Sequence, residues 1–177
     1  MGTVFALQRS TKGGWSGTIL YSFHNNGKDG FSPEAVLTLD ASGNVFSTTT
    51  DGGVYGDGTV FALSRGANGQ WEEKVLYSFN GANGGGSVPY AGLTLDQSGN
   101  LYGTDAVGGQ YSFGTVFELT RGTDGTFAEN VLHSFDPNGQ DGLEPVGAVI
   151  FDTKGNLYGT TSVGGEYGSG SVYEVEP

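Results

Sequence analysis

The chain has 177 residues, with 34 glycines, no cysteine, and 7 basic against 19 acidic side chains, which give a net charge of −12. This length is enough for one domain with a buried core, and the absence of cysteine excludes disulfides, thiolate metal sites and thiol nucleophiles. The negative charge disfavours binding to nucleic acid or anionic membranes. The longest apolar run, residues 146–151, is too short to cross a bilayer, so we expect no membrane insertion.

The tetrapeptide Gly-Thr-Val-Phe starts at residues 2, 58 and 114, and a related Gly-Ser-Val-Tyr starts at residue 170, so the spacing is 56 residues. A fixed period of this size indicates a repeat architecture. We expect one repeat domain over residues 1–177. It would hold repeats at 2–57, 58–113 and 114–169, followed by a terminal strand at 170–177.

Each period carries four short segments with β character, which in chain order are residues 91–96, 100–104, 114–120 and 130–135 of one unit. β-branched or aromatic residues alternate there with small or polar ones, as in half-buried strands, and no segment has helical periodicity. The sequence Asp-x-x-Gly-Asn at 40–44, 96–100 and 152–156 predicts a hairpin turn with glycine at positive φ. A second hairpin turn is expected at 67–69 and 123–125, and longer loops contain a glycine pair or end at a proline.

Four antiparallel strands with two apolar faces describe one blade of a β-propeller. One blade cannot bury both faces, so blades must stack around an axis. The sequence therefore predicts an all-β fold of four-stranded antiparallel propeller blades, with about three blades per chain.

The pattern Asp-x-x-Gly-Asn-Leu-Tyr-Gly-Thr-Thr, followed by the glycine pair, Gly-Thr-Val-Phe-x-Leu and Val-Leu-x-Ser-Phe, resembles the Gloeo/Verruco (GloVer) tandem repeat of bacterial proteins. Copies lie at 96–119 with 131–135, and at 152–160 with 164–165 and 170–173; the first copy departs from the pattern at Phe46 and Ser47. The resemblance implies a propeller and a secreted or cell-surface parent protein, and it implies no reaction. The chain shows no signal peptide and starts within a repeat, so we expect that a leader was removed or left out.

The strand order is also similar to that of NHL-type propeller blades, in which the Leu-x-Leu-Asp strand is innermost. If each blade begins with the Leu-x-Leu-Asp strand, two whole blades lie at about 35–79 and 91–135. The chain begins with the third and fourth strands of a blade and ends with the first three of another. Residues 2–7 and 170–175 then compete for one position. We expect a homo-oligomer that closes a ring through blade and strand complementation, with about nine blades in a trimer or six in a dimer. The alternative is an open arc that belongs to a longer protein.

Aromatic residues recur at equivalent positions and are the candidates for glycan or small-ligand binding, although packing or capping of a blade explains them as well. They are Trp15 and Trp71, with Phe127 at the same place, and Tyr55, Tyr111 and Tyr167. Recurring arginines at 9, 65 and 121 and aspartates at 40, 96 and 152 suggest a structural carboxylate–guanidinium contact. The alternative is that these side chains form a ring of ligating groups around the propeller axis.

Positions that differ between repeats do not converge on a catalytic set, and neither His24 nor His133 has a nucleophile motif beside it. We therefore predict no catalytic residue and no cofactor. Asp29, Asp136 and Asp141 are weak calcium candidates, because acidic turns offer hard oxygen ligands but the spacing of an EF-hand is missing. Solvated turns are the alternative.

Three functions follow from these patterns. The first is a non-catalytic propeller scaffold or interaction module that assembles with itself. The second is a propeller that binds a glycan or small ligand in blade-top loops or a central channel. The third, an enzyme such as a lyase or hydrolase, would need a convergent set of His, Asp and Tyr that the sequence does not display.

Overall fold

The computed structural model describes residues 1–177, except for the side chain of residue 83. It is all-β, and within the described chain the single helical element is the 3₁₀ turn Ala82–Gly84. Among these residues no helix has the length and apolar character needed to span a membrane.

Two complete four-stranded antiparallel sheets occupy the middle of the chain, each with its strands in sequence order as in a propeller blade. We call the first of them blade 2 and the second blade 3. Blade 2 contains β4 (Thr38–Leu39), β5 (Val45–Thr49), β7 (Thr59–Arg65) and β8 (Trp71–Ser78). Blade 3 contains β10 (Thr94–Leu95), β11 (Leu101–Asp105), β13 (Thr115–Arg121) and β14 (Phe127–Ser134).

Two partial sheets flank them. Blade 1 is the hairpin of β1 (Thr3–Arg9) and β2 (Trp15–Ser22), which correspond to the third and fourth strands of a complete blade. Blade 4 consists of β16 (Ile150–Phe151), β17 (Leu157–Thr160) and β19 (Val172–Val175), the first three strands. The phase predicted from the sequence is therefore confirmed at both ends of the chain.

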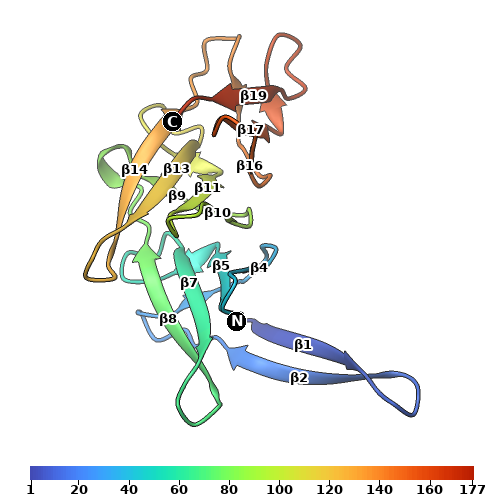
Figure 1. Cartoon of the computed structure of the whole chain (residues 1–177). Helices are drawn as coiled ribbons and strands as arrows, with labels where there is room; N and C mark the ends of the chain where they lie inside the picture. Colours follow the sequence, from blue (N-terminus) through green and yellow to red (C-terminus); the bar gives the residue numbers. More distant parts are fainter.

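The blades follow one another along an open, curved row that does not close on itself (Figure 1). The β1–β2 hairpin reaches out at one end of the row, and β16, β17 and β19 lie at the other. Three apolar clusters fill the spaces between successive blades. The core of this protein therefore lies between sheets rather than inside any one of them.

The Asp-x-x-Gly-Asn turns form as predicted. Asp40 Oδ1 accepts hydrogen bonds from the backbone amides of Ser42 and Asn44, both at 2.8 Å, and Gly43 has φ +82°. The same bonds recur at Asp96 and Asp152. An aspartate that binds amides of its own turn fixes the hairpin between the first and second strands.

The first strand of a blade is shorter than the sequence predicts: β10 has two residues where residues 91–96 were expected. The carbonyls of Ala91 and Leu93 instead accept hydrogen bonds from threonine hydroxyls of blade 2. The third strand starts one residue after the expected Gly114, whose φ of +103° is incompatible with a strand. The fourth strand starts at Phe127, earlier than expected, because Arg121 already pairs with it across the turn.

The two longer loops of each repeat pair with each other, which the sequence did not reveal. The loop between blades and the loop with the glycine pair form a two-stranded antiparallel ladder in all three repeats. The ladders are β3 (Gly30–Phe31) with β6 (Asp51–Gly52), β9 (Gly86–Ser87) with β12 (Val107–Gly108), and β15 (Gly142–Leu143) with β18 (Val163–Gly164).

Candidate functional site

Each complete blade has two apolar faces that meet different neighbours. We call the face toward the following blade the leading face and the other the trailing face. In blade 2, Val60 on the leading face packs against blade 3, whereas Phe61 on the trailing face packs against blade 1. Adjacent residues point to opposite faces because side chains alternate along a strand. A junction is therefore always a leading face packed on a trailing face.

Threonine hydroxyls join neighbouring blades at the inner strands. Thr38 Oγ1 donates to the carbonyl of Leu93 at 2.6 Å, and Thr48 Oγ1 lies 3.0 Å from the carbonyl of Ala91. One repeat later Thr94 donates to the carbonyl of Val149, and Thr104 Oγ1 to that of Gly147 at 3.1 Å. The same polar contacts thus accompany the same apolar packing at both junctions.

Glycine at the start of the Gly-Thr-Val-Phe motif allows close approach of the next blade. A Cβ atom on Gly58 would lie 2.7 Å from Cδ of Pro89 and 2.5 Å from the carbonyl oxygen of Thr49. Gly114 stands in the same relation to Pro145. The motif that reveals the repeat therefore also sets the distance between blades.

One buried and one half-buried carboxyl group lie at the junction of blades 2 and 3. Asp105 is fully buried, its Oδ2 accepts a hydrogen bond from Thr115 Oγ1 at 2.8 Å, and its Oδ1 has no partner. Burial raises the pKa of Asp105 well above its usual value. Glu129 accepts a hydrogen bond from the Tyr77 hydroxyl at 2.9 Å, and burial also raises its pKa.

A related group lies between blades 1 and 2. Asp29 Oδ2 accepts hydrogen bonds from the Tyr21 hydroxyl at 2.9 Å and from the His24 amide at 2.8 Å. Oδ1 of Asp29 and Oε1 of Glu73 are buried without a partner. Burial, with the charge of Asp29 as the second cause, raises the pKa of Glu73 to about 7. The raised pKa of Glu73 ties the stability of this junction to pH.

The third junction has a basic group at this place. His133 replaces the tyrosine, and its Nε2 lies 2.8 Å from Asp141 Oδ2. The same carboxylate accepts the backbone amide of Asp136 at 3.1 Å. His133 therefore holds a loop in place.

The two end faces of the row have no neighbour in the chain. On the trailing face of blade 1, Phe5 is 57% exposed, whereas the equivalent Phe61 and Phe117 are fully buried. On the leading face of blade 4, Val172 is 78% exposed, whereas the equivalent Val60 and Val116 are fully buried. Leu7, Trp15, Ile19, Ile150 and Thr160 are exposed at the same two ends.

The predicted aromatic ligand residues are not gathered into one site. Trp71 packs against the cluster between blades 1 and 2 and lies under Arg65, whose Cζ is 4.8 Å from the ring centroid. Trp15, the equivalent residue, is exposed on the trailing face of blade 1. Tyr55, Tyr111 and Tyr167 are all exposed, each in the glycine-pair loop of a different repeat.

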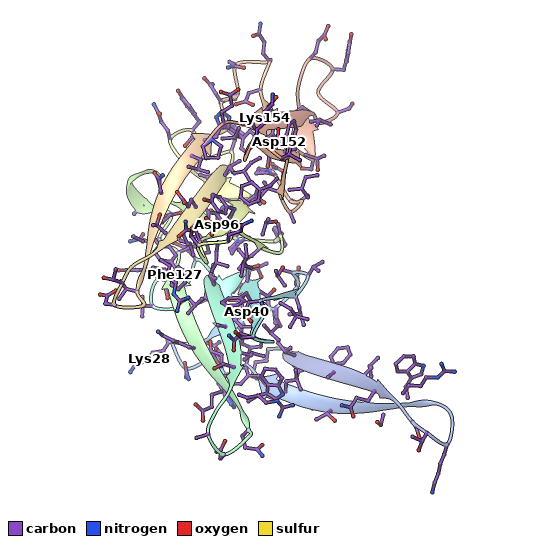
Figure 2. The ribbon with its side chains drawn as sticks, viewed as in Figure 1. Lys28, Asp40, Asp96, Phe127, Asp152 and Lys154 are labelled. Carbon is purple, nitrogen blue, oxygen red and sulfur yellow. The ribbon has the colours of Figure 1, made fainter. Side chains whose placement is uncertain are left out.

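Two shallow grooves, of about 640 and 600 Å³, lie between successive hairpin turns. One runs between the turns at Asp96 and Asp152, the other between those at Asp40 and Asp96, and Figure 2 shows these aspartates one after another along the row of blades. Phe127 lines the groove between the turns at Asp40 and Asp96, whereas none of the predicted tryptophans and tyrosines lines either groove.

The expected contact between recurring arginines and aspartates is wrong. Over the described residues the one ion pair is that of His133 with Asp141. Asp96 binds Ser98 and Asn100 of its own turn, and the Arg65 guanidinium donates to the carbonyl of Gly69 at 2.8 Å. The aspartates recur because each closes its own hairpin turn, and Arg65 likewise binds within its own hairpin.

Two of the three calcium candidates, Asp29 and Asp141, accept hydrogen bonds from nearby protein groups. Asp29 accepts from Tyr21 and His24, and Asp141 accepts from His133 and from the amide of Asp136. Within the part of the chain that the structure describes, no group of three or more His, Cys, Asp or Glu side chains is placed to hold a metal ion.

The sequence analysis did not single out the buried Asp105 or the half-buried Glu73 and Glu129. A signal was present, because Asp105 occupies the position of Thr49 and Thr161 in the other repeats. The two glutamates occupy the position of Gly17. At these positions a carboxyl group replaces the threonine or glycine of another repeat.

A search of curated proteins finds no match to this sequence. The sequence profile of the Gloeobacter/Verrucomicrobia repeat matches residues 1–177, which is the whole of the chain. This agrees with the motifs and with the repeated four-stranded sheets. The chain belongs to the Gloeobacter/Verrucomicrobia repeat family.

Proposed function

We propose that the chain is a non-catalytic propeller scaffold that assembles head to tail with further copies of itself into a closed ring. Three copies with about nine blades are the favoured assembly, and two copies with about six are the second. The family resemblance supports a secreted or cell-surface setting for this scaffold. The observation that carries the proposal is the complementarity of the two end faces.

Blade 1 supplies the third and fourth strands of a blade and blade 4 supplies the first and second, so together they hold a complete set. The exposed Phe5, Leu7 and Val172 occupy positions that are fully buried in both complete blades. In every internal junction a leading face packs on a trailing face. We therefore expect each end face to pack on a face of the opposite kind. A second copy offers the required surface with the required strands.

Magnitudes favour a closed ring over an open chain of copies. Burying one large apolar side chain gains about 1.5–3 kcal/mol. The side chains Phe5, Leu7, Trp15 and Ile19 together therefore contribute on the order of 8 kcal/mol per junction. Each association costs about 4–15 kcal/mol of translational and rotational freedom, so a single junction is marginal. A ring adds one further junction without a further association, which stabilises it relative to an open row.

The native mass tests the proposal. Light scattering over a range of protein concentrations should give a species of three chains, about 55 kDa, or of two, about 37 kDa, against 18.3 kDa for one chain. Phe5→Asp places a charge on the trailing end face and should leave a monomer. Val54→Asp, which changes an exposed apolar residue of a loop, is the matched control and should assemble normally. A sharp 18 kDa species at all concentrations would overturn the proposal.

A further inference from the structure

We infer that β19 is a temporary strand, which the β1–β2 hairpin of a neighbouring copy displaces when the chains assemble. The inference rests on the proposed assembly and names the strand that moves. In the completed blade, β16 and β17 of one copy would pair with β1 and β2 of the next. β19 would leave the sheet.

Both strands cannot occupy the blade together. β17 pairs with β19 in the register Leu157 to Val175, which repeats Leu101 to Leu119 in blade 3. Leu7 of β1 stands at the equivalent position, one repeat before Leu63. A junction between two copies therefore brings two strands to a single third-strand position, so one of them has to be displaced.

The lengths of the two ladders decide which strand leaves. β1 pairs with β2 through seven residues, Thr3 to Arg9, whereas β19 pairs with β17 through four, Val172 to Val175. The outer edge of β19 has no partner, because blade 4 has no fourth strand. Keeping β19 would require the hairpin to give up the longer ladder, so β19 is the strand that leaves at lower cost.

The side chains point to the same strand. Tyr173 of β19 stands where Phe61 and Phe117 stand in the complete blades, and its hydroxyl is buried without a hydrogen-bond partner. A Cβ atom on the facing Gly159 would lie within 2.2 Å of this oxygen, so the glycine leaves just enough room for the ring. Phe5 of a neighbouring copy has no hydroxyl and removes the unsatisfied group.

The exchange also covers the remaining exposed groups. In blade 3 the equivalent of Trp15 is Phe127, which packs on the leading face of blade 2. Trp15 of the incoming hairpin would meet Tyr102 and Leu132 on the leading face of blade 3. Val4 and Val172 occupy equivalent positions in the third strand. Val4 of the incoming hairpin already packs against blade 2 of its own chain, so the completed blade has a buried valine there without the exposed Val172.

A strand that leaves on assembly also has a purpose before assembly. Without β19, the edge of β17 would present unpaired backbone groups, which invite pairing with any extended chain. β19 covers this edge with a short ladder that a better-fitting strand can replace. β19 thereby holds the place of the third strand until a neighbouring hairpin arrives, while its own short outer edge stays unpaired.

Hydrogen exchange on the parent chain, measured with and without assembly, tests the displacement. Amides of residues 172–175 should exchange faster in the assembled species than in the monomer, and those of β1 should stay protected. In a Trp71→Phe variant, Trp15 is the sole tryptophan, and its emission should shift to shorter wavelength on assembly. Protected amides at 172–175 in an oligomer would overturn the inference while leaving the proposed assembly in place.

Two variants of β19 distinguish a strand that is displaced on assembly from a strand that stays in the sheet. Truncation after Gly170 should keep the oligomer and lower the concentration for half-assembly. Tyr173→Phe repairs the unsatisfied hydroxyl, holds β19 in place and should raise that concentration about tenfold. Tyr167→Phe, at an exposed tyrosine of the glycine-pair loop, is the control with little expected effect. Loss of assembly on truncation contradicts the inference, and a monomeric parent chain contradicts the proposed function itself.

Discussion

At the scale of single residues, the informative positions are those where one repeat differs from the others. Asp105 lies where Thr49 and Thr161 lie, and all three contact the hydroxyl at the start of the third strand. The threonines are fully satisfied by such contacts, whereas Asp105 keeps one oxygen without a partner. A buried carboxyl group of this kind costs stability once it has to ionise.

Asp105→Thr should stabilise the chain at neutral and alkaline pH by about 2 kcal/mol. Burial raises the pKa of Asp105, so the unfolded chain ionises first as pH rises, and the folded state loses stability through that window. Threonine has no such loss and fits beside Gly86 as Thr49 fits beside Gly30. Thermal unfolding at pH 8 is the measurement. The reciprocal Thr49→Asp should destabilise, and a lower melting temperature for Asp105→Thr would contradict this account.

Ionisation of Glu73 is a second reason why the stability of the folded chain depends on pH. Its folded pKa is about 7 against an ordinary 4.5, so below pH 4.5 both states hold the proton and nothing is lost. Between pH 4.5 and 7 the unfolded chain ionises while the folded chain does not, so stability falls, and above pH 7 the loss is complete.

Glu73→Gln should therefore raise stability at pH 8 by about 1–2 kcal/mol, less than the full pKa shift implies because water screens the half-exposed side chain. At pH 4 the variant and the parent should be alike. Chemical unfolding at the two pH values is the measurement, and Glu72→Gln, on the exposed face of the same strand, is the control. Equal gains at pH 4 and pH 8 would argue against titration of Glu73.

At the scale of elements, the repeat sequence predicts much of the fold, because identical strands and turns leave few arrangements open. The order of the four strands, the Asp-x-x-Gly-Asn turns and the incomplete end blades are all confirmed. The ladder of β3 with β6 was not predicted, since two-residue strands carry no periodicity. The arginine–aspartate contact was wrong because recurrence at a fixed spacing does not separate a contact within a turn from one between blades.

The candidate site was only partly predictable for the same reason. The sequence suggested that residues 2–7 and 170–175 compete, but it could not show that Tyr173 is buried without a partner. The aromatic candidates were chosen for their recurrence, and the structure places them in separate blades or on an end face. A contact between repeats depends on how blades are spaced, and this spacing is encoded in glycine and proline positions far apart in the sequence.

Gly58 tests that spacing. Gly58→Ala should destabilise the chain by about 2 kcal/mol more than Gly43→Ala, because both glycines have positive φ but only Gly58 meets Pro89 and the backbone of Thr49. A Cβ atom on Gly43 has nothing within 4 Å. Thermal unfolding of both variants is the measurement. Equal losses would mean that backbone conformation alone, and not the approach of the next blade, keeps the glycine.

At the scale of the whole molecule, charge and apolar burial act against each other. Each chain carries −12, so three chains together would carry −36. The end faces themselves are apolar, with Phe5, Leu7 and Trp15 on one and Ile150 and Val172 on the other. Long-range repulsion therefore opposes an association that short-range packing favours.

Salt should then strengthen assembly. The Debye length falls from about 30 Å at 0.01 M to about 8 Å at 0.15 M ionic strength, so repulsion between copies is screened while apolar burial is not weakened. The concentration for half-assembly, followed by light scattering or by Trp15 emission in the Trp71→Phe variant, should decrease on going from 0.01 to 0.15 M sodium chloride. Glu72→Gln removes one exposed charge and should reduce this salt dependence slightly. Dissociation on addition of salt would mean that ion pairs hold the copies together, and that the apolar end faces are not the junction.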